Sequence, residues 1–170
     1  MQLQKDYVNA SLKNFAVYFD QYQAILDTLT TSHRASLIYF FCHGAASQLK
    51  FDDSKSIFKP THVMGASYPG WPIVFVNACD AADISPLSFL PFRTKFRSKK
   101  AAGLIAPSFP IPTLFAALFA KAFFARYANH EPVGEILLNL RRGLLAKNNP
   151  LGLWYSLQCP LDVSAPENRS

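Results

Sequence analysis

Two residues with chemically active side chains each follow an apolar stretch of this 170-residue chain. His43 comes after LIYFFC, and Cys79 comes after PIVFVNA. A thiol and an imidazole held close together can perform nucleophilic acyl transfer, because the sulfur attacks a carbonyl carbon while the imidazole moves the protons. Taken singly, such a cysteine is more often a small buried hydrophobe, and such a histidine is more often a satisfied core or loop group. A catalytic role for the pair becomes a stronger hypothesis only if the fold brings the two residues together.

The two apolar stretches are predicted to be parallel strands of one sheet. Residues 37–42 and 72–78 are short, β-prone and apolar at successive positions, as in strands that are covered on both faces. Functional groups gather at the carboxyl ends of such strands, so His43 and Cys79 are expected at the same edge if the strands are neighbours. There Gly44 would let its backbone N–H approach a developing oxyanion, beside the N–H of Cys79.

The rest of the chain alternates between helical and extended patterns. Helices are predicted for residues 7–29, 85–100, 113–128 and 133–147, and further strands for residues 102–107 and 152–158. The polar, interrupted segment 45–70 is expected to contain a small hairpin or loop and a short helix. Alternating strands and helices predict a single α/β domain over residues 1–170, built around a mostly parallel central sheet.

Composition places the chain among folded proteins. Hydrophobic residues make up 50% of it and charged residues 16%, which favours a packed core. The net charge is +6, but the basic residues at 93–100 and 141–142 belong to no nucleic-acid-binding motif, so a solvated basic face is the preferred interpretation and nucleic acid is not expected as a direct ligand. Three prolines within residues 104–124 would break a membrane-spanning helix there, so no membrane association is expected.

The cysteines and histidines show neither a C-x-x-C pair nor metal-ligand spacing, so no metal and no cofactor are expected. Cys42 alternates to the face of its strand opposite His43 and is expected to pack in the core. His33, His62 and His130 lie in polar, loop-like surroundings and are expected to face solvent. An odd number of cysteines without a signal peptide favours the reducing cytoplasm.

Four blocks follow one another with plausible spacing: LIYFFCHG at 37–44, PIVFVNACDAA at 72–82, AAGLIA at 101–106 and PVGEILLNLRRGLLAKNNPLGLWYSL at 132–157. Together they resemble a bacterial CHAT domain, the caspase-like peptidase module shared with separase. The resemblance extends from about residue 36 to residue 157. It implies a three-layer sandwich of the caspase–haemoglobinase type.

The resemblance further implies a cysteine endopeptidase that cleaves protein or peptide substrates. Cys79 would be the nucleophile that forms a thioester acyl-enzyme, and His43 would be the general acid and base. The N–H groups of Gly44 and Cys79 would form the oxyanion hole, and Asn77 would line the specificity pocket. In this family the module usually lies at the C-terminus behind sensor domains. The chain is therefore expected to be a regulated cytoplasmic effector and the C-terminal part of a larger protein, with a regulatory repeat domain or an activator protein as partner.

The segment after the third strand departs from the family pattern. Ser108 and Thr113 stand where relatives carry acidic residues that pair with a basic P1 side chain. P1 specificity is therefore open, with a weak preference for a basic residue from the family alone. A catalytically inactive caspase-fold interaction module remains the alternative function. Residues 93–100 follow the nucleophile where caspase-type zymogens are often cut, but the outer face of an amphipathic helix is the preferred interpretation.

Overall fold

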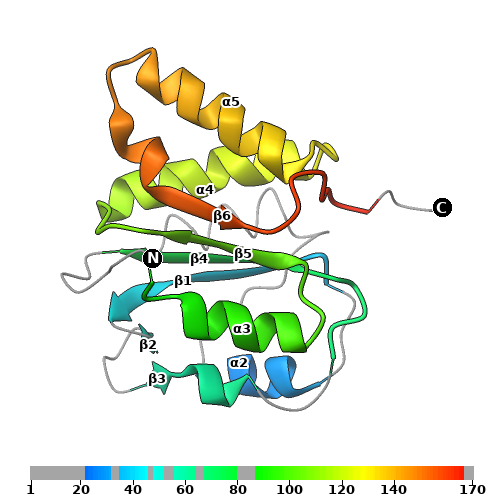
Figure 1. The fold of residues 1–170 in the computed structure, drawn as a ribbon. Coiled ribbons are helices and arrows are strands. Elements are labelled where there is room, and N and C mark those ends of the chain that lie inside the picture. Colours follow the sequence, from blue (N-terminus) through cyan, green and yellow to red (C-terminus); the bar gives the residue numbers. More distant parts are fainter. Residues whose placement is uncertain are drawn as a thin grey trace.

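The computed structural model describes residues 22–31, 35–45, 48–51, 56–63, 67–79 and 87–166. In this part of the chain, one mixed sheet has the strand order β3-β2-β1-β4-β5-β6 (Figure 1). Its strands are β1 (Leu37–Ala45), β2 (Gln48–Lys50), β3 (Ile57–Phe58), β4 (Ile73–Cys79), β5 (Gly103–Pro107) and β6 (Tyr155–Gln158). The predicted strands 37–42, 72–78 and 102–107 correspond to β1, β4 and β5. The segment 45–70 contains the expected hairpin, formed by β2 and β3.

Helices cover both faces of the sheet. They are α2 (Tyr22–Thr30), α3 (Leu90–Ser98), α4 (Thr113–Tyr127) and α5 (Val133–Leu145), with short 3-10 helices η1 (Pro60–His62) and η2 (Pro150–Trp154). In Figure 1, α2 and α3 lie below the sheet, whereas α4 and α5 lie above it. The chain is therefore an α/β protein with the arrangement of a three-layer sandwich. The helices predicted at 85–100, 113–128 and 133–147 correspond to α3, α4 and α5. Only α2 represents the predicted helix 7–29, because residues 7–21 lie outside the described residues.

The centre of the sheet is parallel, as predicted, but its margins are antiparallel. β1 pairs with β4 and β4 with β5 in parallel, whereas β2, β3 and β6 join in antiparallel pairs. Connections as short as those around β2 cannot cross the sheet, so they reverse the chain. β6 is reversed for a different reason. Two helices, α4 and α5, separate it from β5. The chain runs back along the sheet in α4 and forward again in α5, so β6 starts near the end of β5 and runs in the opposite direction.

Two apolar clusters fill the layers on either side of the sheet. Phe40 and Cys42 of β1 belong to the cluster beneath α2 and α3, whereas Tyr39 and Phe41 pack against the cluster beneath α4 and α5. Cys42 is 5% exposed, which confirms its expected packing in the core. Rings stack within both clusters: the centroids of Phe58 and Phe92 are 5.8 Å apart, and those of Phe119 and Tyr155 are 4.2 Å apart. Each such pair adds about 0.5–1.5 kcal/mol beyond its buried area.

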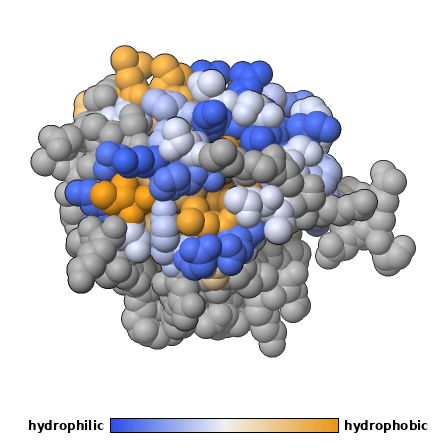
Figure 2. Space-filling view, turned by 90° about the horizontal axis from the view of Figure 1, so that it is seen from below, coloured by the Kyte–Doolittle hydropathy of each residue, from blue (hydrophilic) through white to orange (hydrophobic). Residues whose placement is uncertain are grey.

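The face that carries α2 and α3 is mixed in character. Figure 2 shows hydrophilic side chains there, beside separate hydrophobic patches. In residues 104–124, β5 is followed by the proline-rich connection and then by α4, as the sequence predicted. Within the described ranges, every helix is too short or too polar to cross a lipid bilayer.

Candidate active site

His43 and Cys79 lie directly opposite each other on neighbouring parallel strands. The register of β1 and β4 runs from the pair Leu37↔Ile73 to the pair His43↔Cys79. Adjacent strands are about 4.8 Å apart, and register partners in a parallel pair share a face of the sheet. Both residues are therefore at the carboxyl edge, on the face that α4 and α5 cover, and the His43 side chain is exposed. The two residues are therefore neighbours in the sheet, as expected, while their roles as base and nucleophile stay predictions.

Lys50 is a third member of this level of the sheet, which the sequence analysis missed. It pairs with His43 across the antiparallel β1–β2 ladder, so the order across the sheet is Lys50, His43, Cys79. Leu49, the residue before Lys50, is 0% exposed and belongs to the opposite cluster. This alternation places Lys50 on the same face as His43. Lys50 is adjacent to His43 and one strand further from Cys79, so its positive charge would favour negative charge on a reacting oxygen near His43 and, at longer range, on the sulfur.

Gly44 follows His43 within β1, which continues to Ala45. It is buried and lies opposite Leu49 of β2. The oxyanion-binding role of its N–H stays a prediction. Asp80 and the other residues up to 86, which follow Cys79, lie outside the described residues.

Asn77 is fully buried at 0% exposure and lies two residues before Cys79, on the same face of β4. Its Nδ2 donates to the Ala116 carbonyl oxygen at 2.7 Å and to Tyr39 Oη at 3.1 Å. The Tyr155 hydroxyl donates to its Oδ1 at 2.6 Å. The amide thus ties β1, β4, β6 and α4 together directly beneath the His43–Cys79 level. To line a specificity pocket, as the family resemblance implies, the amide would have to leave these partners.

The connection between β5 and α4 reaches the same edge of the sheet. Ser108 is half-buried, and its backbone N–H donates to the Trp154 carbonyl oxygen at 2.6 Å. Thr113 is half-buried and begins α4. Residues 108–113 carry no charged side chain, so this connection brings hydroxyl and apolar groups to the edge and no carboxylate.

The other described cysteines are poor nucleophiles. Cys42 is buried. Burial, with a smaller contribution from the charge of Asp162, raises the pKa of the Cys159 thiol to about 11. A thiol with that pKa is almost wholly protonated at neutral pH, and the thiolate is the reactive form. Neither residue therefore competes with Cys79 for an electrophile near pH 7.

The solvent-facing position expected for His62 is wrong. His62 is half-buried, and its Nδ1 is 2.9 Å from the Tyr22 hydroxyl and 3.3 Å from the backbone nitrogen of Lys59. The cause is the turn of η1, which brings the ring back against α2. His130 is exposed, as expected, and His33 lies outside the described residues.

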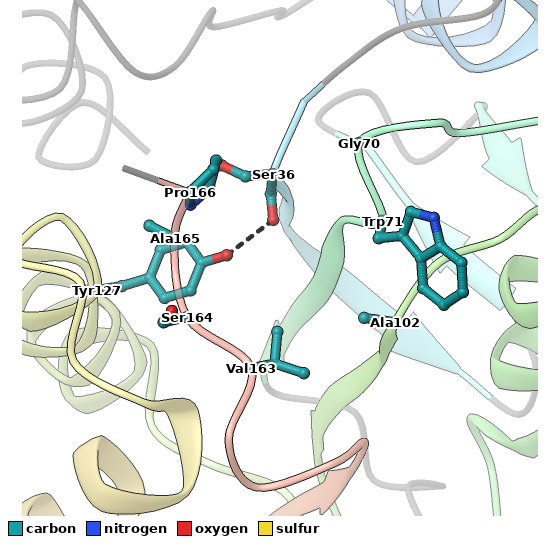
Figure 3. Close-up of a pocket in the computed structure, with 9 residues that line it drawn as sticks. All are labelled: Ser36, Gly70, Trp71, Ala102, Tyr127, Val163, Ser164, Ala165 and Pro166. Atoms are coloured by element: carbon teal, nitrogen blue, oxygen red, sulfur yellow. Dashed lines mark hydrogen bonds between the residues drawn. The ribbon is translucent and has the colours of Figure 1, made fainter. Parts of the chain in front are cut away.

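A separate pocket of about 560 Å³ lies at the opposite edge of the sheet (Figure 3). Ser36, Trp71 and Ala102, which precede β1, β4 and β5, line one side of it, and residues 163–166 line another. The Tyr127 hydroxyl donates to the Ser36 carbonyl oxygen at 3.0 Å, and burial raises the pKa of Tyr127 to about 12. This pocket lies at the amino ends of the strands, so it is distinct from the edge that carries His43.

No protein-family model matches the sequence, and no curated protein is similar to it. Among the described residues, no cluster of three or more His, Cys, Asp or Glu side chains could hold a metal ion.

Proposed function

We propose that this chain is a caspase-like cysteine endopeptidase of the CHAT type, with Cys79 as nucleophile and His43 as general acid and base. One observation carries the proposal: the register His43↔Cys79 on two parallel strands that end at the same edge. The sheet thus pairs a possible base, His43, with a possible nucleophile, Cys79, although the two residues are far apart in the sequence. The three-layer α/β arrangement, with its parallel centre, is compatible with a caspase–haemoglobinase fold.

The reaction follows from the two side chains. The Cys79 thiol gives its proton to His43, the sulfur adds to the carbonyl carbon of a peptide bond, and the negative charge on the oxygen is stabilised by the N–H groups of Gly44 and Cys79. His43 passes that proton to the leaving amine, the C–N bond breaks, and a thioester remains. A water molecule then attacks the thioester while His43 accepts a proton from it; the C–S bond breaks, the acid is released, and His43 returns the proton to the sulfur to restore the thiol. Lys50 adds positive charge beside the reacting groups throughout the cycle.

The scaffold suits this chemistry because both residues stand on strands and not on loops. Side chains on strands are held more closely to one geometry than side chains on loops. The amide of Asn77 links both strands to α4 and β6 one level below. We assign Asn77 a role in holding the strand ends in position, in addition to any role near the substrate.

Substrate preference does not follow from the dyad. Asn77 is occupied by partners within the protein, and residues 108–113 carry no charge, so a basic P1 side chain has no carboxylate partner in either place. We propose a protein or peptide substrate with an open P1 preference. The proposal also includes a cytoplasmic location and control by a regulatory repeat domain or an activator protein.

The buried state of Asn77 favours one second candidate, a catalytically inactive caspase-fold interaction module. In that case His43 and Cys79 would be remnants of an ancestral dyad without activity, and Asn77 would stabilise the core and not line a specificity pocket.

Labelling with peptidyl acyloxymethyl ketones separates the two candidates. Probes with Arg, Asp or Leu at P1 are incubated at pH 7 with the wild type, Cys79→Ala, His43→Ala and, as a matched control, Cys159→Ala, and adducts are located by mass spectrometry. An active peptidase gives one adduct at Cys79, and its rate falls about 10²-fold or more in His43→Ala. Cys159→Ala leaves the labelling unchanged. Adducts that persist in Cys79→Ala, or no adduct with any P1 residue, contradict the peptidase proposal.

A further inference from the structure

The outward surface of α3 combines exposed leucines with a run of cations. Leu87 is 71% exposed and Leu90 is 41% exposed. The cationic residues that follow them are Arg93, Lys95, Arg97, Lys99 and Lys100. Lys99 already has an interaction within the chain, so we define the α3 surface as the two leucines together with Arg93, Lys95, Arg97 and Lys100.

The core determines which way this surface faces. Phe92 and Phe96 are 0% and 1% exposed and pack beneath α3 against the sheet, so Lys95 and Arg97 point outward and are exposed. Because α3 connects the end of β4 with the start of β5 (Figure 1), Leu87 lies towards the edge that carries the candidate active site. The cations extend from there towards the opposite edge, over about 10 Å at the helical rise per residue. Hydrophobic and hydrophilic side chains lie side by side on this part of the molecule (Figure 2).

Within the part of the chain that the structure describes, no carboxylate forms an ion pair with a cation of the α3 surface. The sequence contains no Asp or Glu from residue 84 to residue 130. The Arg126–Glu131 ion pair, formed between described residues, lies at the C-terminal end of α4. The Nε of Arg93 is buried and has no hydrogen-bond partner among the described residues. Because Arg93 Nε is buried, an external partner would be bound by the exposed cations, and a surface with several such cations is suited to an anionic partner.

We infer that the α3 surface binds an acidic, partly apolar segment of another protein. Carboxylates of such a segment would pair with the cations, and its apolar side chains would cover Leu87 and Leu90. A nucleic-acid backbone offers phosphates but no apolar groups for two leucines. Binding to a bilayer needs a continuous apolar face, whereas here the leucines occupy one end and the cations the rest. The partner is therefore a protein segment, and its binding does not depend on the proposed peptidase activity.

Fluorescence anisotropy of the full chain tests this inference. The probe is a fluorescein-labelled peptide of about a dozen residues in which Asp and Glu alternate with Leu. The expected result is saturable binding that weakens as salt is raised, since exposed charge pairs are screened within about 10 Å at 0.1 M salt. Replacing Arg93, Lys95, Arg97 and Lys100 together by Gln should lower the affinity by about tenfold or more. Leu87→Ser with Leu90→Ser should also weaken binding.

The matched control removes positive charge elsewhere. Arg142→Gln with Lys147→Gln changes exposed cations on and beside α5 and should leave the peptide affinity unchanged. Far-UV circular dichroism confirms that each variant is folded. The inference is overturned if the acidic peptide does not bind, or if the α3 variants and the α5 control lose affinity equally. It is also overturned if a DNA duplex, or vesicles containing phosphatidylserine, bind more tightly than the peptide through the same residues.

Discussion

Replacing Asn77 by aspartate would test the buried network beneath the His43–Cys79 level with almost no change of shape. The amide Nδ2 donates to the Ala116 carbonyl oxygen at 2.7 Å, and the Tyr155 hydroxyl donates to Oδ1 at 2.6 Å. An ionised carboxylate in this place would face the carbonyl oxygen with nothing to donate. A protonated carboxyl could keep both hydrogen bonds. We therefore expect the folded state of Asn77→Asp to retain the proton, so that the pKa of the new carboxyl lies above its ordinary value near 4.

The sign and size of the effect follow from this raised pKa. Below about pH 4 the carboxyl is protonated in both states, and the variant loses about 1 kcal/mol, one net hydrogen bond, because its single O–H replaces the two N–H donors of the amide and the bond donated to Tyr39 Oη is lost. Above pH 4 the unfolded state releases the proton while the folded state holds it. Stability then falls by about 1.4 kcal/mol for each pH unit, up to about 4 kcal/mol more at pH 7.

Urea denaturation followed by circular dichroism between pH 4 and pH 8 measures this difference between variant and wild type. The matched control is Asn139→Asp on the exposed side of α5, which should stay within about 0.5 kcal/mol of the wild type at every pH. A stability loss for Asn77→Asp that does not grow with pH would contradict this expectation, because the amide could not then be buried against a carbonyl oxygen.

Three further outcomes are expected. Gly103→Ala should lower the free energy of unfolding by about 1–3 kcal/mol, because the new Cβ would lie 2.5 Å from a backbone carbonyl oxygen of β6; Gly143→Ala in α5, where a Cβ meets nothing within 4 Å, should stabilise the chain by up to about 1 kcal/mol. Burial raises the pKa of Tyr68 from 10.0 to about 12, so stability should fall as pH rises through this window, and the fall should be shallower in Tyr68→Phe when thermal melts are recorded at pH 9–12. Lys50→Met should slow alkylation of Cys79 by iodoacetamide several-fold, while Lys50→Arg should not; equal rates in both would remove Lys50 from the site.

The apolar strands and helices were predictable because burial on this scale leaves a clear periodic pattern. Residues 72–78 predict β4 (Ile73–Cys79) and residues 113–128 predict α4 (Thr113–Tyr127), each within a residue at either end. In both, the signal is a dense run of apolar side chains bounded by proline or glycine. The neighbour relation of His43 and Cys79 follows from the same pattern, since consecutive parallel strands tend to pair.

Other features depend on tertiary contacts that leave little trace in a local pattern. β2 and β3 are short, and their register, which places Lys50 beside His43, is determined by one buried residue on each strand. The antiparallel direction of β6 depends on how two helices return the chain. The hydrogen-bond partners of Asn77 have no local signal, because Ala116 and Tyr155 lie far along the sequence and meet it only in the folded sheet.

The buried state of Asn77 also limits where selectivity can arise in the proposed enzyme. β4 presents Cys79 and Asn77 on one face, and the residues between and before them alternate into the opposite core or pack against α4. Because the Asn77 amide is held by three partners, β4 itself can supply the nucleophile but no free polar group for a substrate side chain. Selectivity must then come from the connections that meet at the carboxyl edge, such as residues 108–113, and from surfaces farther from His43 and Cys79. Replacing residues in that connection should therefore change P1 preference while leaving the rate of Cys79 alkylation by a small electrophile unchanged.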